Sequence, residues 1–220
     1  MTISLRAAVA LAAGLGLVAC SSDANNTMGW TQARAALASI GSGPKAPARV
    51  PQLTPQQVDK SPVRLLFVTV ESDGRGTGFG RISSNGGTDT YASLDGITLA
   101  MRDGVLVSTR NLPPDLMSSQ VPSARQIASG QGSHARSYQI LDGADQTQSL
   151  RYECHLRREG VETLEIAGRR HATRVVDEIC IGDGSVFENR FWIDGSGKIR
   201  QSRQWTGTSV GNLRLSDPHG

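Results

Sequence analysis

The feature that most constrains this chain is a succession of short β-type segments that begins near Val63 and runs to the C-terminus. The first, Arg64 to Val70, is rich in β-branched and aromatic residues, and short turns containing Gly or Asp separate the later ones. βαβ units would place helices between the strands, but no helical periodicity of about ten residues occurs between these segments. The pattern therefore predicts an antiparallel all-β fold and leaves open a curled sheet, a sandwich or a barrel.

Two Asp-Gly pairs, Asp95-Gly96 and Asp103-Gly104, predict the turns of a three-stranded meander, because both central residues of a type I′ turn take positive φ. The expected strands are 90–94, 97–101, 105–109, 138–141, 149–157, 162–167, 173–181, 186–193, 198–205 and 212–215. Between the two halves, we expect Pro113-Pro114 to start one helical turn and residues 118–136 to form a loop.

The first twenty residues predict export. An apolar run from Ala7 to Ala19 follows a short basic start and is too short for a permanent membrane span, which indicates a signal peptide over residues 1–19. Leu17-Val18-Ala19-Cys20 resembles the lipobox of bacterial lipoproteins, which implies that Cys20 carries diacylglycerol and an amide-linked acyl chain such as palmitate. Ser21, in place of Asp, implies sorting to the outer membrane of a Gram-negative cell, where the protein would face the periplasm.

Residues 20–62 are expected to connect this anchor to the folded domain. Apolar residues at Trp30, Ala33, Leu37 and Ile40 have the spacing of a short amphipathic helix. Prolines then recur between Pro44 and Pro62, which predicts a semi-extended spacer. The expected organisation is a signal peptide over 1–19, a lipidated N-terminus with helix and Pro-rich linker over 20–62, and a β domain over 63–220.

The chain has three cysteines, so assigning Cys20 to lipid leaves Cys154 and Cys180. In an exported protein this pair favours a disulfide, and closing the loop would stabilise the fold by about 3 to 4 kcal/mol. A flat meander that turns at Glu159-Gly160 would place the two cysteines roughly 20 Å apart, whereas bridged Cα atoms lie within about 7 Å. The disulfide is favoured, and it predicts that this meander is not regular.

Motifs for catalysis or cofactor binding are scarce. The run Gly74 to Gly80 is spaced like a phosphate-binding loop, but no helix follows it, and it is expected to be a flexible hairpin. A zinc site is disfavoured because neighbouring residues of a strand face opposite sides of a sheet; the residues concerned are Cys154, His155, His171 and Cys180. The formal net charge of +3 is too small to indicate nucleic-acid binding. We expect no enzyme, metal or cofactor.

A longer pattern resembles the YjbF/GfcB lipoproteins of exopolysaccharide and capsule gene clusters. It comprises Gly86-Gly87-Thr88-Asp89-Thr90-Tyr91, Leu94-Asp95-Gly96-Ile97-Thr98-Leu99, Arg102 to Leu112, Asp115-Leu116-Met117-Ser118, Asn189-Arg190-Phe191-Trp192-Ile193-Asp194, Gly197-Lys198-Ile199 and Ser202-Arg203-Gln204-Trp205-Thr206-Gly207. Pro113-Pro114 departs from the glycine-rich turn expected at that point.

The resemblance implies a non-enzymatic outer-membrane lipoprotein that acts as an accessory or scaffold in polysaccharide assembly or export. Its implied partners are an outer-membrane β-barrel and periplasmic proteins of the export cluster. The alternative is a periplasmic glycan-binding module, and a polysaccharide-modifying enzyme is a third, less favoured class. Trp192 and Trp205 are candidate contacts with a glycan or partner if they are exposed, although large aromatic residues are more often part of a core.

Overall fold

The computed structural model describes residues 31–32, 34–35, 37, 49–141 and 146–220, and in these the dominant element is one antiparallel sheet of twelve strands. The strands are β1 (Leu65–Val70), β2 (Gly76–Asn85), β3 (Thr88–Ala92), β4 (Thr98–Arg102), β5 (Val105–Arg110), β6 (Asp115–Gln120), β7 (Ser133–Leu141), β8 (Thr147–Ile166), β9 (Arg169–Gly182), β10 (Ser185–Asp194), β11 (Ile199–Trp205) and β12 (Asn212–Ser216). Two short helices, α2 (Pro55–Asp59) and α3 (Ala124–Ser129), accompany them. The predicted all-β class is confirmed.

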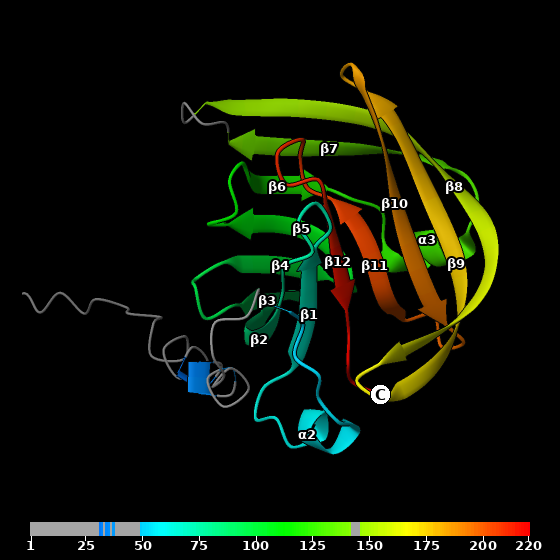
Figure 1. The fold of residues 1–220 in the computed structure, drawn as a ribbon. Helices are drawn as coiled ribbons and strands as arrows, with labels where there is room; N and C mark the ends of the chain where they lie inside the picture. Colours follow the sequence, from blue (N-terminus) through cyan, green and yellow to red (C-terminus); the bar gives the residue numbers. More distant parts are fainter. Residues whose placement is uncertain (1–30, 33, 36, 38–48, 142–145) are drawn as a thin grey trace, which may run out of the picture.

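The sheet curls into a nearly closed barrel (Figure 1). Its order is β5-β4-β3-β2-β1-β12-β11-β10-β9-β8-β7-β6, so β1 pairs with β12, and the consecutive strands β5 and β6 are the two ends of the sheet. Side chains link these ends: Ser119 Oγ donates to the Val107 carbonyl at 2.9 Å, and Thr109 Oγ1 accepts from the Leu116 N–H at 2.9 Å. Of the three predicted architectures, the barrel describes the fold best, and two facing sheets are not formed.

The barrel interior is filled by side chains from both halves of the chain. The larger cluster runs from β1 through β12 and includes an aromatic group of Tyr138, Tyr152, Phe187 and Trp205. A second cluster forms where α3 inserts Ile127 against β9, β10 and β11. Helix α3 is capped at its start by Ser123, whose side chain accepts from the Gln126 N–H, and at its end by Gly130. The expected loop over 118–136 is therefore wrong, because it contains the end of β6, this helix and the start of β7.

The longest strand explains how the cysteines meet. No turn forms at Glu159-Gly160; β8 continues through that position with an irregularity between Arg158 and Gly160, and the chain reverses only at Ala167-Gly168. A β-bulge absorbs one residue without ending the strand. The prediction of separate strands over 149–157 and 162–167 is thus wrong, and removing that turn removes the conflict with the disulfide.

Two other local predictions have different outcomes. At Asp103-Gly104 both residues have positive φ, as a type I′ turn requires, whereas of the pair Asp95-Gly96 only Gly96 does. The Pro113-Pro114 bond is cis and leads directly into β6, so the helical turn expected there is wrong.

The glycine-rich run belongs to the β1–β2 hairpin: Gly74 lies in the turn, and β2 begins at Gly76, so most of the run is strand. Its glycines allow the N-terminal segment to approach closely: a β-carbon at position 76 would lie 2.6 Å from Val50 Cγ2 and 2.8 Å from the Val50 backbone nitrogen. At Gly78 the nearest atom is Leu37 Cδ2, at an ordinary 3.4 Å. We call residues 31–62, where described, the N-terminal arm.

The arm packs along the outer wall of β1 and β2. Its described residues between 31 and 37 are helical, as the apolar spacing predicts, and Leu37 is buried against Val63 and Leu65. This explains why β1 is buried on both faces: Leu66 and Val68 belong to the core of the barrel, and the arm covers Leu65.

The proline-rich part of the arm includes α2, where an extended conformation was expected. Thr54 and Gln57 form a capping box around Pro55, which favours a helix start, and Val58 is buried. Arg169, at the start of β9, donates to the Pro55 carbonyl, to Asp59 and to the Pro218 carbonyl. One guanidinium thus joins α2, the β8–β9 hairpin and the C-terminal tail at one end of the barrel (Figure 1). In the described part of the chain, no helix is long and apolar enough to span a membrane.

Candidate functional site

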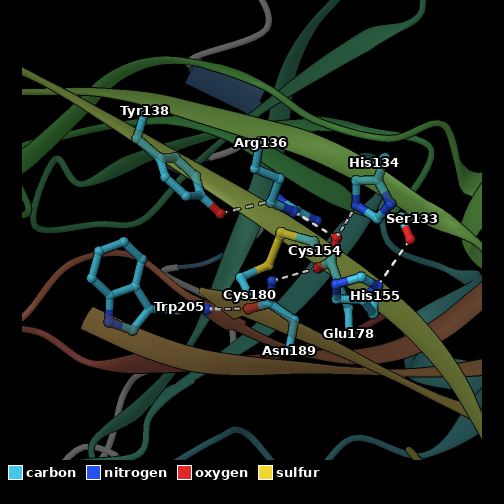
Figure 2. The surroundings of a disulfide bond; sticks show 10 residues. All are labelled: Ser133, His134, Arg136, Tyr138, Cys154, His155, Glu178, Cys180, Asn189 and Trp205. Carbon is cyan, nitrogen blue, oxygen red and sulfur yellow. Dashed lines mark hydrogen bonds and ion pairs between the residues drawn. A yellow bond between two sulfur atoms is a disulfide. The ribbon is translucent and has the colours of Figure 1, made fainter. Parts of the chain in front are cut away.

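Cys154 and Cys180 form the disulfide that the cysteine count favoured. They are direct cross-strand partners on β8 and β9, with Cα atoms 4.1 Å apart, and both are fully buried. Figure 2 shows polar side chains from β7, β9 and β10 gathered around the bond. The disulfide network is our name for Cys154, Cys180, His134, Arg136, Glu178 and Asn189.

Glu178 is the centre of this network. It accepts hydrogen bonds from Arg136 Nε at 2.7 Å and Asn189 Nδ2 at 2.6 Å, and it contacts His134 Nε2 at 2.6 Å. Burial alone would raise the pKa of Glu178, but the charge of Arg136 and the hydrogen bonds from His134, Arg136 and Asn189 lower it to about 2. The carboxylate is therefore ionised and fully engaged.

Arg136 is almost completely buried and extends the network to the aromatic group, since its Nη1 donates to the Tyr138 hydroxyl at 3.1 Å. Asn189 Oδ1 accepts from the Trp205 backbone N–H at 2.7 Å, which ties β10 to β11 (Figure 2). Each member of the network is thus bonded across strands, which is the arrangement expected of a structural ion pair and not of a reactive group.

The donor atoms near the disulfide do not make a metal centre. His134, Cys154 and Glu178 have ligand atoms within 4.8 Å of one another, but the Cys154 sulfur is bonded to Cys180 and Glu178 is paired with Arg136. His155 faces away from Cys154 and shares a hydrogen bond with Ser133 Oγ at 2.9 Å (Figure 2).

The two candidate tryptophans do not offer open faces. Trp192 is 5% exposed, its Nε1 donates to Glu162 at 2.7 Å, and the Arg214 guanidinium lies 5.8 Å from its ring centroid. Trp205 is partly buried and stacks on Phe187 with ring centroids 4.5 Å apart. Trp192 is therefore not exposed as a glycan or partner contact would require, and Phe187 covers one face of Trp205.

A second polar arrangement lies at the opposite end of the barrel interior from the β9–β10 turn. It is a cleft of about 630 Å³ between the wall of β1 to β4 and the wall of β11 and β12. Leu66, Met101, Ile199 and Leu215 give it apolar surface, and charged side chains line both walls. This volume is within the range of about 300 to 1,000 Å³ typical of small-molecule sites.

Asp217 organises one side of the cleft. Its Oδ2 contacts Arg64 Nη2 at 2.5 Å and Lys198 Nζ at 2.8 Å, while its Oδ1 accepts from the His219 N–H at 3.0 Å. Burial alone would raise the pKa of Asp217, whereas the hydrogen bond from Lys198 and the charges of Arg64 and Lys198 lower it. Two cations therefore share one ionised carboxylate oxygen.

The β1–β4 wall, to which Arg64 also belongs, carries Arg81, Asp89 and Tyr91. Arg81 Nη1 lies 3.3 Å from both carboxylate oxygens of Asp89. Burial, and next the charge of Asp89, raises the pKa of Tyr91 to about 12, so its hydroxyl keeps its proton at neutral pH. The cleft thus presents donors and acceptors side by side.

The sequence did not predict the buried network or the cleft. An available signal for the network was Asp177-Glu178, two consecutive acids inside the otherwise apolar strand 175–181. Both are fully buried: Glu178 belongs to the network, and Asp177 forms a two-pronged pair with Arg190 at 2.5 and 2.7 Å. The cleft had no local signal, because its walls are far apart in the sequence. Cys20 and the signal peptide lie outside the described residues.

An antiparallel, nearly closed barrel with a docked N-terminal arm is the fold class that these observations define, and comparison with known proteins gives the family. Residues 30–216 match the family described as "Group 4 capsule polysaccharide lipoprotein gfcB, YjbF". The match covers most of the chain, so the chain belongs to this lipoprotein family, as the sequence pattern predicted.

One curated protein and one solved structure are similar to the chain. The chain is 29% identical over 132 residues to "Uncharacterized lipoprotein YjbF" of Escherichia coli K12, covering 55% of this chain and 59% of the relative. The matched region therefore spans less than two thirds of that protein. The crystal structure of the hypothetical lipoprotein YmcC from the same organism superposes with a TM-score of 0.68, 21% identity, and coverage of 77% of this chain and 90% of that one. At this identity the likeness concerns the fold.

Proposed function

We propose that this protein is a non-enzymatic lipoprotein, anchored in the outer membrane through acylated Cys20 and facing the periplasm, that acts as an accessory or scaffold in capsule or exopolysaccharide assembly or export. The observation that carries the proposal is the family match over residues 30–216, which includes every strand of the barrel. The lipobox Leu17-Val18-Ala19-Cys20 and the following Ser21 support the anchor and its membrane.

The state of the buried acids favours a non-enzymatic role. A general acid or base needs a titratable group that can exchange a proton near the working pH. Glu178 instead has three polar partners and a pKa of about 2, and Asp177 is paired with Arg190. The partners of Glu178 keep its carboxylate ionised, and both acids hold neighbouring strands together.

The β9–β10 hairpin offers a surface for a protein partner. Ile181 and Val186 are opposite each other in register and are 56% and 66% exposed. Isolated exposed aliphatic residues are common, but a directly paired set at the end of a projecting hairpin can add apolar area to an interface. The partners proposed are an outer-membrane β-barrel and periplasmic proteins of the export cluster.

Photo-crosslinking in cells tests the scaffold. A photoreactive residue replaces Val186 in the full lipoprotein, and a matched variant carries it at Val161, which is 80% exposed on β8. We expect Val186 to capture an outer-membrane β-barrel or a periplasmic export protein. Capture only from Val161 would place the contact on the wrong surface, and capture from neither position would contradict the scaffold.

The alternative is a periplasmic glycan-binding module, and the cleft is the observation that favours it. A soluble form with Cys20 replaced by Ser, lacking the signal peptide, should then bind the purified polymer of its own cluster. Failure to bind, alongside successful crosslinking to a protein, would leave the scaffold and remove the glycan module.

A further inference from the structure

The Asp217 side of the cleft is locally rich in positive charge. Arg64 and Lys198 meet at the same oxygen of Asp217, and their side chains are 30% and 36% exposed. Arg200, also in the cleft wall, is already satisfied by Asp194 at 2.5 Å and by the His219 carbonyl at 2.6 Å. A ligand that enters the cleft can therefore reach Arg64 and Lys198, and a second carboxylate there would balance the shared charge.

The strands next to Arg64, β2 and β3, fit hydroxyl groups. Tyr91 lines the cleft beside Arg64 and, although it is only 5% exposed, keeps its hydroxyl proton, while Asp89 and the exposed Asp103 supply carboxylate acceptors. Ionised carboxylates accept hydrogen bonds but donate none, so they suit a ligand with many O–H groups. The cleft therefore fits a ligand with one anionic group at Lys198 and Arg64 and several hydroxyl groups beside it, next to a partly apolar surface.

We infer that the cleft binds a saccharide segment that carries a carboxylate, with the carboxylate at Arg64 and Lys198 and ring hydroxyl groups toward Asp89 and Tyr91. The inference rests on the glycan-binding alternative above and names its ligand class and site. It does not require that a protein partner be absent, because the paired residues Ile181 and Val186 lie at the other end of the barrel.

Titration calorimetry tests the inference on the soluble chain with Cys20 replaced by Ser. The probes are trigalacturonic acid and the neutral maltotriose. We expect the acidic trisaccharide to bind at least fivefold more tightly, and Lys198→Ala to weaken its binding at least fivefold. Lys60→Ala, which removes an exposed lysine on the C-terminal end of α2, is the matched control and should leave binding within twofold.

Tyr91→Phe separates the hydroxyl contact from the carboxylate contact. It removes the hydroxyl and keeps the ring, so it should weaken both saccharides about equally, whereas Lys198→Ala should act on the acidic one. Equal binding of both saccharides to the unmodified chain, no binding of either, or full binding by Lys198→Ala would overturn the inference. Crosslinking at Val186 in the Lys198→Ala lipoprotein distinguishes failure of the saccharide site from failure of the scaffold proposal. Loss of the saccharide site alone leaves capture of the protein partner intact.

Discussion

The disulfide network and the cleft use the same chemical pair, a guanidinium and a carboxylate, in opposite surroundings. Arg136 and Glu178 are sealed in the barrel, with side-chain exposures of 1% and 0%. Arg64 and Asp217 are 30% and 15% exposed, and a third charged group, Lys198, shares their contact. A buried pair is costly to break because the remaining charge is stranded, whereas a partly exposed pair that shares a third charge contributes less to stability. The first therefore fixes the fold, and the second is available to a ligand.

Breaking the buried pair tests this difference most severely. Arg136→Met should lower the free energy of unfolding by about 3 to 5 kcal/mol, because it leaves the Glu178 carboxylate buried without its charge partner. Urea unfolding measures the loss. Arg64→Met, the same substitution in the cleft, should cost about 1 kcal/mol or less. Similar losses of unfolding free energy in the two variants would show that the two ion pairs contribute equally to stability.

Removing the disulfide is expected to have the next largest effect. Cys154→Ala with Cys180→Ala should destabilise the domain by about 2 to 4 kcal/mol, since the bond closes a loop with a sequence separation of 26. Thermal unfolding of the soluble chain with Cys20 replaced by Ser measures this. Thiol titration of that denatured chain should detect no free thiol before reduction and two after it; two free thiols at the outset would contradict the bridge.

Acid should weaken the network through Glu178. Its pKa is lowered from 4.5 to about 2 on folding, so the unfolded chain binds the proton more readily as the pH falls. The stability from this group is complete above about pH 4.5 and is lost as the pH falls toward 2. Urea unfolding from pH 7 to 2.5 measures the slope.

Asp217→Asn is the control for that acid effect, because the pKa of Asp217 is also lowered on folding. The variant should keep most of the acid-dependent loss if Glu178 dominates it. A variant with a flat stability profile between pH 4.5 and 2.5 would assign the effect to the cleft.

The arm allows a smaller, more local test. Gly76→Ala places a methyl group 2.6 Å from Val50 Cγ2 and 2.8 Å from its backbone nitrogen, so the arm must move away, whereas Gly78→Ala meets only an ordinary contact at 3.4 Å. We expect faster proteolysis and hydrogen exchange in residues 49–53 for Gly76→Ala only, with a loss of about 1 to 3 kcal/mol at most. Equal behaviour of the two variants would show that the arm does not rest on these glycines.

The sequence predicted most strands because alternation and Asp-Gly turns are local properties. It predicted the disulfide from compartment and parity, although the turn assumed at Glu159-Gly160 was wrong, since Gly160 can stand in a bulge as well as in a turn. Helix α3 had the signals Ser123, Gln126 and Gly130, but at six residues it is too short to show periodicity.

The remaining features depend on contacts across long sequence distances. Glycines in a sequence can serve either the freedom of the backbone or the close approach of a neighbouring segment. At Gly76 only the position of Val50 shows that the second role applies. The predicted loop over residues 118–136 includes Arg136, because the burial of an arginine cannot be predicted without knowing that Glu178 contacts it. The cleft likewise exists only once β1 to β4 curl to face β11 and β12.

The docked arm also limits the distance between the barrel and the membrane. With lipid on Cys20, as proposed, the chain outside the described helical residues is the stretch from Cys20 to Thr31, eleven residues that span at most about 40 Å when fully extended. A free connection as far as Val63 would reach about 150 Å. The shorter connection confines the domain to a thinner layer next to the membrane and so raises its local concentration there. Even a weak contact with a membrane-embedded partner would then be occupied much of the time.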